Sequence, residues 1–281
     1  MHPRARGVTG ADATFAQAPD PRSDGAVQPR PVEAAEEIVP PLEEEGADAR
    51  VERLRGARTE TEDVILRRRS VRLYKKRQVP EFMVKRILEA GRFAPTAGNG
   101  QAWKFVVLRD PELIQGLTDT TVRICKLFTW LLDYRGRRFS WRLPLAKLLI
   151  RAKPNDLHPV PFSAVALIAE RRLGVYHGAP TVILILKDVR GVSNPDLDCG
   201  IAGQNMVLAA HSMGLGTCWV SFTKLAFQYT RRWRRRLGIG YPYKFVSSLA
   251  VGFPMGQPDG VVARPTVAVD WFEDGVRKVV G

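Results

Sequence analysis

The sequence predicts an α+β or α/β fold built around one β-sheet. Segments whose apolar residues recur at helical spacing alternate along the chain with short runs of β-branched and other apolar residues. The 281 residues are 45% hydrophobic and 26% charged, which is ordinary for a globular protein. A body of roughly 200 residues can bury a substantial core without disulfides or a structural metal.

The N-terminal residues 1–58 are expected to form a disordered acidic tail. Residues 1–50 are rich in Ala, Pro, Asp, Glu and Gly and carry a net charge of −5, whereas the whole chain carries +14. Such a segment cannot bury enough apolar surface to offset the entropy that is lost on ordering. A solvated tail is therefore favoured over a tether or a targeting segment, and residues 59–281 are expected to form the folded domain.

The cysteines and the apolar runs indicate the compartment. Cys125, Cys199 and Cys218 lie far apart and form no CxxC pair, so neither a zinc site nor a disulfide framework is expected. The N-terminus lacks the apolar region of a signal peptide, and no run of about 18 apolar residues is present. These features predict a cytoplasmic protein. Its strongly basic body favours anionic partners without selecting one.

The first expected elements are two helices. Residues 61–68 have helical character. Pro80 opens the second helix, because the N–H that proline lacks would be unpaired in a first turn anyway. Apolar residues from Val84 to Gly91 share one face of this helix, and Pro95 ends it.

The remaining elements continue the alternation without an internal repeat. Gly214 is expected to end a helix in the left-handed conformation that glycine adopts without strain. In chain order, the expected elements are a buried strand over 105–108, two helices within 119–160 separated near Gly136, a strand over 181–186, a helix over 198–213, a strand over 217–220, a basic helix over 224–236 and a strand over 247–252.

Three arginines and a hydroxyl fall within five residues, at Arg68, Arg69, Ser70 and Arg72. A guanidinium group offers fixed, forked donors that pair with two phosphate oxygens at once, so the cluster suits a phosphate. A basic run is more often a solvated surface. The cluster alone therefore does not establish a binding site.

Two glycine-containing junctions add to this cluster. Residues 94–103 join a helix to a strand, and the amides of Asn99 and Gln101 suit the alternating N–H and C=O edge of a flavin. The alternative is a plain turn with Trp103 in the core. Residues 214–219 lead from an Ala-rich helix through a glycine pair into a strand, which alone is an ordinary junction.

In their order and spacing, these motifs resemble the nitroreductase family. The resemblance spans about residues 61–270 and is weak over residues 119–175. The segments that carry it are Arg68–Arg72, Val79-Pro80, Ala94–Trp103, Gly214–Trp219, Val251-Gly252-Phe253-Pro254 and Arg264-Pro265.

The resemblance implies an α+β sandwich, with a mostly antiparallel central sheet flanked by helices, built as an intertwined homodimer with FMN at the interface. The residues that it implies at the FMN are Arg68, Arg69, Ser70 and Arg72 at the phosphate and ribityl chain, Arg264 at the phosphate, Pro95, Thr96 and Asn99 from the partner chain along the isoalloxazine with Gln101 nearby, and the backbone of Leu215 and Gly216 near the ring.

The resemblance also implies an enzyme that transfers hydride from NADPH or NADH to a small electron-poor acceptor, such as a nitroaromatic or a quinone, by a ping-pong mechanism. The chemistry would take place at N5 of the FMN, so no protein residue is expected as the catalyst, and no metal is expected. Two alternatives remain. One is a dehalogenase or a flavin-consuming enzyme of the same fold, and the other is a non-catalytic flavin-binding or membrane-associated protein.

Two basic stretches and an isolated histidine complete the interpretation. Residues 119–160 mix Trp130 and leucines with Arg and Lys, and a lid over the flavin is favoured over peripheral contact with a membrane surface. Residues 231–236 are interpreted as a solvated helix face, because no nucleic-acid-binding motif accompanies them, and nucleic acid is not an expected partner. His177 is interpreted as a packing residue.

Overall fold

The computed structural model describes residues 58–132, 144, 148, 151, 159–192, 194–256 and 267–280. Residues 1–57 of the expected tail and Arg264 lie outside the described residues, as does Gly136 with most of the stretch from 133 to 158. The helices and strands below belong to the unit that begins at Arg58.

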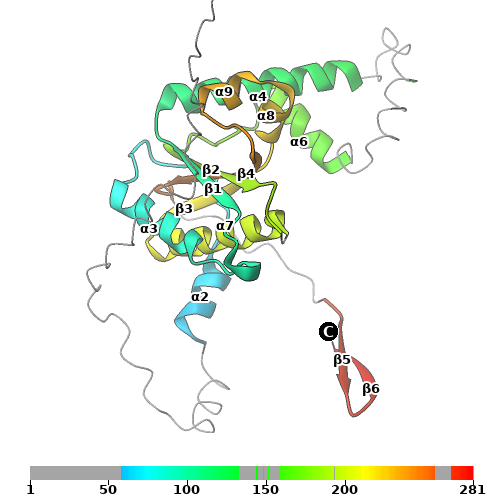
Figure 1. Cartoon of the computed structure of the whole chain (residues 1–281). Helices are drawn as coiled ribbons and strands as arrows, with labels where there is room; N and C mark the ends of the chain where they lie inside the picture. Colours follow the sequence, from blue (N-terminus) through cyan, green and yellow to red (C-terminus); the bar gives the residue numbers. More distant parts are fainter. Residues whose placement is uncertain are drawn as a thin grey trace, which may run out of the picture. The chain divides into compact units, whose positions relative to one another are not determined.

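Four antiparallel strands form the central sheet (Figure 1). They are β1 (Trp103–Leu108), β2 (Thr181–Asp188), β3 (Gly216–Val220) and β4 (Tyr243–Gly252), in the spatial order β1-β2-β4-β3. Every pairing within this sheet is antiparallel. This arrangement confirms the α+β class with an antiparallel sheet that the resemblance implies, with β1 and β3 at the two edges.

Helices cover both faces of the sheet (Figure 1). One face carries α4 (Pro111–Leu132), α6 (Pro159–Ala169), α8 (Lys224–Tyr229) and α9 (Arg232–Arg236). The other face carries α3 (Glu81–Arg92) and α7 (Pro195–Ser212), and α2 (Glu60–Arg67) contacts α7. The first of the two helices expected within 119–160 begins earlier, at Pro111.

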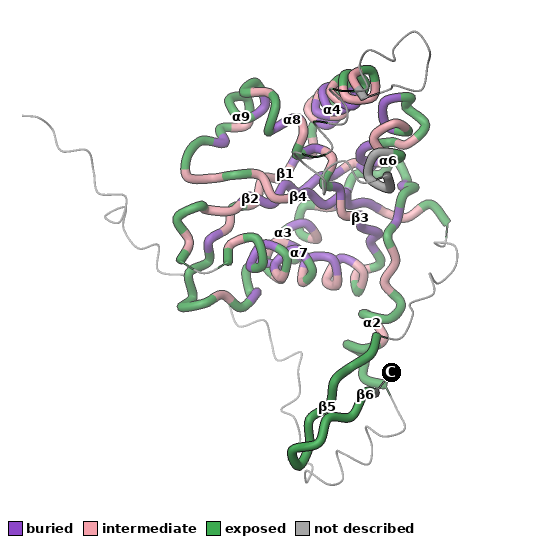
Figure 2. Tube along the Cα trace, turned by 90° about the vertical axis from the view of Figure 1, so that its right-hand side faces the viewer, coloured by how far each residue is buried: buried purple, intermediate pink, exposed green. Residues whose placement is uncertain are grey.

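The core consists of two apolar clusters separated by the sheet. Along β2, Val182, Leu184 and Leu186 pack into the cluster under α4 and α8, whereas Ile183 and Ile185 pack into the cluster under α3 and α7. All five side chains are fully buried, and buried residues occupy the sheet between the two helical layers in the burial view (Figure 2). Burial on both faces explains why this strand is an uninterrupted apolar run rather than an alternating one.

The single basic helix expected over 224–236 is wrong, because the chain breaks at Thr230 into α8 and α9. Thr230 is extended, with φ −131° and ψ 140°, and its hydroxyl donates to the Ala226 carbonyl at 2.8 Å. The break reorients the chain so that Trp233 is buried, with 1% of its surface exposed. Local sequence periodicity does not report such a tertiary contact.

A C-terminal hairpin was not among the expected elements. It consists of β5 (Val269–Glu273) and β6 (Val276–Val280). Asp274 and Gly275 connect the strands with φ values of 51° and 72°. Two positive φ values in a two-residue turn match the type I′ hairpin that Asp-Gly favours.

Candidate functional site

The arginine cluster lies beside the start of β3. Val71 donates its N–H to the Thr217 carbonyl at 2.9 Å, and Ser70 forms a parallel bridge with Thr217. Farther along, the Lys75 N–H donates to the Phe253 carbonyl at 2.8 Å. These backbone contacts fix the segment from Arg68 to Arg72 against the Gly216 end of the sheet.

Gly216 permits this close approach. A Cβ atom at Gly216 would lie 2.6 Å from Cγ2 of Val71, a separation that real Cβ atoms do not adopt. Gly216 also pairs with Gly252 in the sheet. The glycine expected near the ligand from the sequence is therefore required first by the packing of the arginine segment on β3.

The positive charges of the cluster act on two histidines. Burial, and then the charges of Arg68 and Arg69, lower the pKa of His211 below its ordinary value. Burial, and then the charge of Arg72, lower the pKa of His177. Like charges disfavour protonation, so these histidines are neighbours of the arginines in the fold. Sequence reasoning missed this role because both histidines are distant from the cluster along the chain.

Some predicted donors near the cluster already have internal partners. Nη1 of Arg69 donates to the Leu66 carbonyl at 2.6 Å and to the Arg68 carbonyl at 2.8 Å, at the C-terminus of α2. The Leu215 N–H donates to the Ala210 carbonyl at 2.9 Å, and the Leu215 side chain is buried. Arg68 is half-buried, whereas Ser70 and Arg72 are exposed. Ser70 and Arg72 are thus the accessible members of the cluster.

The second predicted group forms a tight loop before β1. A short 3₁₀-helix, η1 (Ala97–Asn99), occupies it, and Gly98, Asn99 and Gln101 have φ values of 58°, 53° and 43°. Left-handed backbone at two non-glycine residues costs energy and is found preferentially at binding sites. Nε2 of Gln101 donates to Oδ1 of Asn99 at 2.9 Å, so the two predicted amides lie together.

The loop borders an open hollow of about 660 Å³. This volume is within the usual range for small-molecule sites. Pro95, Asn99 and Gln101 are exposed and Thr96 is half-buried, with Oγ1 of Thr96 accepting the Gln101 N–H at 3.2 Å. The residues that line the hollow are Ala97, Gly98, Gly100, Gln101, Ala102, Trp103, Asp188, Arg190, Gly191, Val192 and Tyr243.

The two predicted groups lie at opposite ends of the sheet within one chain. Gly216, beside the arginine segment, pairs with Gly252 of β4, and the neighbouring Val251 pairs with Thr181 of β2. Val182, which follows Thr181, pairs with Leu108, so the arginine segment lies at the Leu108 end of the sheet. Trp103, which follows the loop, pairs instead with Lys187. The length of β1 therefore separates the groups by roughly 16 Å along the strands, at about 3.3 Å per residue, and they also flank opposite edges. One chain does not bring them together.

Within the described ranges, no group of three or more His, Cys, Asp or Glu side chains is arranged to hold a metal ion. No helix in the same ranges is both long and apolar enough to cross a membrane. Cys125 and Cys199 are buried free thiols whose pKa values are raised by burial, to about 11 and about 12.

Comparison with known proteins identifies the family of this chain. Residues 65–253 match the model of the nitroreductase family. Over 196 residues the chain is 26% identical to a protein of Archaeoglobus fulgidus described as an NADH dehydrogenase/NAD(P)H nitroreductase, covering 70% of this chain and 86% of that protein. The match to the family model covers more than half of the chain.

Two solved structures have a similar fold. A nitroreductase with bound FMN from Desulfitobacterium hafniense aligns with a TM-score of 0.56 at 26% identity, covering 74% of this chain and 96% of that one. A nitroreductase with bound FMN from Bacteroides fragilis aligns with a TM-score of 0.53 at 22% identity, covering 75% and 99%. The resemblance inferred from the motifs is confirmed, and the chain belongs to the nitroreductase family.

Proposed function

We propose that this protein is an FMN-dependent oxidoreductase that transfers hydride from NADPH or NADH to a small electron-poor acceptor. The observation that carries the proposal is the arginine segment held against β3, together with a strained amide-bearing loop in a chain of the nitroreductase family. The relatives named above are described as NAD(P)H nitroreductases or contain FMN.

The donor set at the Arg68–Arg72 segment fits the phosphate end of FMN. Three guanidinium groups and the Ser70 hydroxyl supply donors that suit a phosphate dianion. Of these, Ser70 and Arg72 are exposed, and Arg68 is half-buried. We assign the phosphate and ribityl chain to Arg68, Ser70 and Arg72. Arg69 contributes its charge, while its Nη1 donates to the Leu66 carbonyl at the C-terminus of α2. Arg264 is assigned to the phosphate on the family resemblance.

The loop residues Pro95, Thr96, Asn99 and Gln101 are assigned to the isoalloxazine ring. Asn99 and Gln101 present amides that can both donate to and accept from the polar edge of the ring. Because this loop and the arginine segment lie at opposite ends of one chain, the site is completed by a second copy. We therefore propose a homodimer in which each FMN is held by the arginines of one chain and the loop of its partner.

Exposed apolar side chains support such a dimer. Phe82 and Phe93 on and after α3 are 62% and 73% exposed, and Leu197 on α7 is 59% exposed. They belong to the same helical layer as Ile65 and Leu66 of α2, which are about half exposed. A second copy that covers this layer would bury these side chains, and their burial would contribute to the stability of the dimer.

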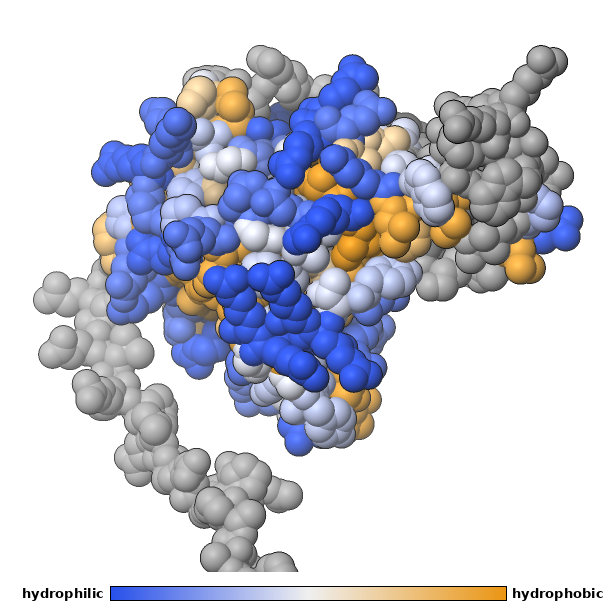
Figure 3. Space-filling view, turned by 90° about the horizontal axis from the view of Figure 1, so that it is seen from above, coloured by the Kyte–Doolittle hydropathy of each residue, from blue (hydrophilic) through white to orange (hydrophobic). Residues whose placement is uncertain are grey.

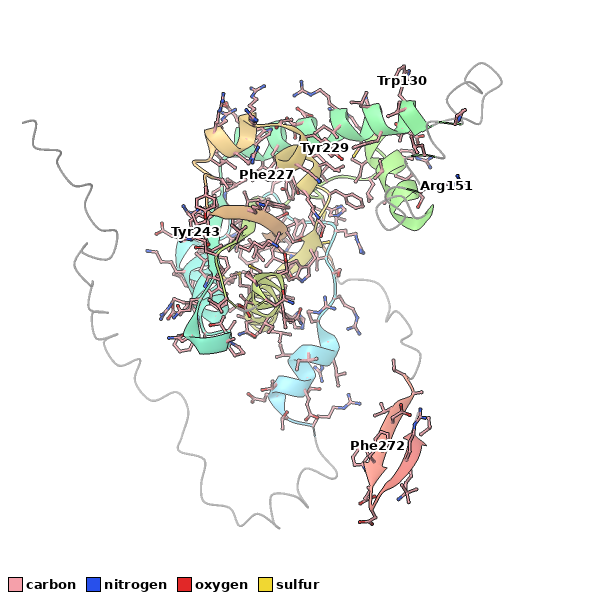
Figure 4. All side chains as sticks on the ribbon, turned by 45° about the vertical axis from the view of Figure 1, so that its right-hand side comes forward. Trp130, Arg151, Phe227, Tyr229, Tyr243 and Phe272 are labelled. Carbon is pink, nitrogen blue, oxygen red and sulfur yellow. The ribbon has the colours of Figure 1, made fainter. Side chains whose placement is uncertain are left out.

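The bound FMN would supply the hydride chemistry in a ping-pong cycle, in which donor and acceptor use the site in turn. The chain itself binds and orients the cofactor, and its arginines offset the negative charge of the phosphate. We assign the stretch at about 119–160 to a lid that selects the acceptor, with a membrane-surface contact as its alternative. Trp130, at the end of α4, is 54% exposed, as that assignment requires (Figure 4). We place the protein in the cytoplasm.

The test is a visible absorption spectrum of the purified full chain, followed by anaerobic addition of NADPH or NADH. We expect a flavin spectrum that bleaches with the nicotinamide and recovers on adding a nitroaromatic or a quinone. A chain that binds no flavin after reconstitution with FMN would contradict the proposal. Bound flavin that neither nicotinamide reduces would contradict the assigned donor.

A further inference from the structure

A second hollow lies between α9 and the start of β4. It has a volume of about 540 Å³, within the range of small-molecule sites. Its lining residues are Arg231, Arg234, Arg235, Gly238, Ile239, Gly240, Tyr241, Pro242, Tyr243 and Lys244. We call the hollow that these residues line the basic pocket. Its arginines belong to the stretch that was interpreted from the sequence as a solvated helix face. Figure 3 views the molecule from the side of α4, α8 and α9, where hydrophilic side chains cover much of the surface.

Among the residues that the structure describes, the charged side chains that line the basic pocket are all cations. In that part of the chain, none of Arg231, Arg234, Arg235 and Lys244 has a carboxylate within salt-bridge distance. Other exposed arginines do have one, for example Arg92 with Glu89 and Arg190 with Asp188. Four exposed cations without a carboxylate partner around one hollow favour the binding of an anion.

The helix that carries the pocket arginines is held in place. Nε1 of Trp233 donates to Oγ1 of Thr120 on α4 at 2.9 Å, and the indole is buried. The guanidinium of Arg236 lies 5.4 Å from the centre of the Trp233 ring. With Trp233 and Arg236 engaged in this way, Arg234 and Arg235 line the pocket from a fixed helix rather than from a loop. The anchored helix fixes the backbone positions from which these two arginines extend.

The basic pocket also contains aromatic rings. Tyr241 is 83% exposed, and Tyr243 is half-buried with Nζ of Lys104 at 5.0 Å from its ring centre. Arginine and lysine bind phosphates, and an exposed tyrosine ring offers a face on which a base can stack. Phosphate donors beside a stacking ring suit a phosphorylated nucleoside better than a simple inorganic anion.

The basic pocket adjoins the hollow of the loop. Tyr243 lines both cavities. The register agrees, since Asp188 beside the loop pairs with Tyr243 and Trp103 pairs with Lys187. Figure 4 shows Tyr243 on the opposite side of the domain from Trp130 and Arg151, so the basic pocket is separate from the proposed lid.

We propose that the basic pocket binds the phosphorylated adenosine end of the nicotinamide donor, while the nicotinamide end reaches the ring beside the loop of the same chain. This inference rests on the proposed function. It assigns NADPH rather than NADH as the preferred donor, because the additional 2′-phosphate brings two further negative charges to four unneutralised cations.

The test is steady-state kinetics of the flavin-loaded full chain with three donors: NADPH, NADH and reduced nicotinamide mononucleotide, which lacks the adenosine end. We expect Arg234→Glu/Arg235→Glu to raise KM for NADPH at least about tenfold, which corresponds to ~1.4 kcal/mol. KM for the mononucleotide should stay unchanged. The matched control is Arg232→Glu, on the same helix but outside the pocket lining, which should leave both values unchanged.

A second measurement is calorimetric binding of 2′,5′-ADP, which does not depend on turnover. We expect the parent chain to bind it and the double variant to bind at least about tenfold more weakly. An equal loss of activity with NADPH and the mononucleotide would overturn the inference, as would an unchanged KM for NADPH. Binding of 2′,5′-ADP without an effect on NADPH kinetics would place a free nucleotide in the pocket and overturn the donor assignment. Failure of all three donors to reduce the flavin of the parent chain would instead count against the proposed function.

Discussion

The molecule has two basic surfaces that look alike in the sequence and differ in how the fold supports them. Arg68–Arg72 is a segment without regular structure that backbone hydrogen bonds hold against β3. Arg231–Lys244 is built from a short helix, a turn and a strand end, and a buried indole anchors it. Both suit phosphates, but only the first was interpreted as a binding site from its sequence.

The difference shows that arginine composition alone does not separate a binding site from a solvated face. The first surface is recognisable because its arginines fall within five residues and belong to a family motif. The second depends on Trp233 reaching Thr120, which is 113 residues away in the chain. Its cations converge on a hollow only in the folded protein, where α9 meets the start of β4.

Removing the anchor of the second surface should have the largest effect on stability. Trp233→Ala removes a fully buried indole and is expected to lower the free energy of unfolding by about 3–5 kcal/mol. Urea denaturation followed by circular dichroism measures this change. A loss below about 1 kcal/mol would mean that α9 is not anchored as described.

Crowding the first surface should have an intermediate effect. Gly216→Val adds atoms where a Cβ would lie 2.6 Å from Val71, and we expect a cost of about 1–3 kcal/mol together with weaker FMN binding. Thermal denaturation and flavin titration measure the two quantities. Gly200→Ala is the matched control, because a Cβ atom at Gly200 would have no atom of another element within 4 Å and alanine favours the helix. Unchanged FMN binding in the valine variant would contradict the assigned role of the segment.

Neutralising one arginine of the first surface should act on the phosphate alone. Arg72→Gln is expected to weaken FMN binding by roughly tenfold or more, since a hydrogen bond to a charged group contributes about 1.5–3 kcal/mol. Riboflavin, which has no phosphate, should bind the variant and the parent equally. Fluorescence quenching titrations with both flavins separate these cases. Equal weakening for the two flavins would place Arg72 at the ring instead.

The smallest effect should be a change in the titration of His211. Its pKa in the folded protein lies below the ordinary value of about 6.5, through burial and the charges of Arg68 and Arg69. Below that ordinary value the unfolded chain binds the proton more readily than the folded chain. This group therefore stabilises the fold fully above about pH 6.5, and that contribution is lost as the pH falls.

An anion at the first surface should raise this pKa, because it offsets the arginine charges. A nuclear magnetic resonance titration of the histidine ring, with and without FMN, measures the shift. The His177 ring provides an internal comparison, since burial and then the charge of Arg72 lower its pKa. A His211 pKa that does not respond to FMN would mean that the phosphate binds elsewhere.

Local patterns predicted much of the fold. The β-branched run at 181–186 became β2, the glycine at 214 has the expected positive φ of 75°, and the helix after Pro80 is α3. The break at Thr230 was not predicted, because it accompanies the burial of Trp233, a tertiary contact that local sequence patterns do not report. The turn at Asp274-Gly275 carried a readable signal that was overlooked.

The arrangement of the site depended on strand register, which sequence patterns do not give. Arg72 and Asn99 were both selected from the sequence, but the pairing of β1 and β3 with their neighbours separates them to opposite ends of the sheet. That separation is what argues for a site shared between two chains.

A mixed-dimer experiment tests the shared site most directly. One variant, Arg68→Gln/Arg72→Gln, impairs the arginine segment, and the other, Asn99→Asp/Gln101→Glu, impairs the loop with little change in size. Each alone should lose FMN. Co-expressed with different affinity tags and purified through both, the mixed dimer should regain one FMN per dimer, because one pairing of intact segment and intact loop remains. A mixed dimer that binds no FMN, beside a parent chain that does, would show that each site is formed within one chain and would contradict the account.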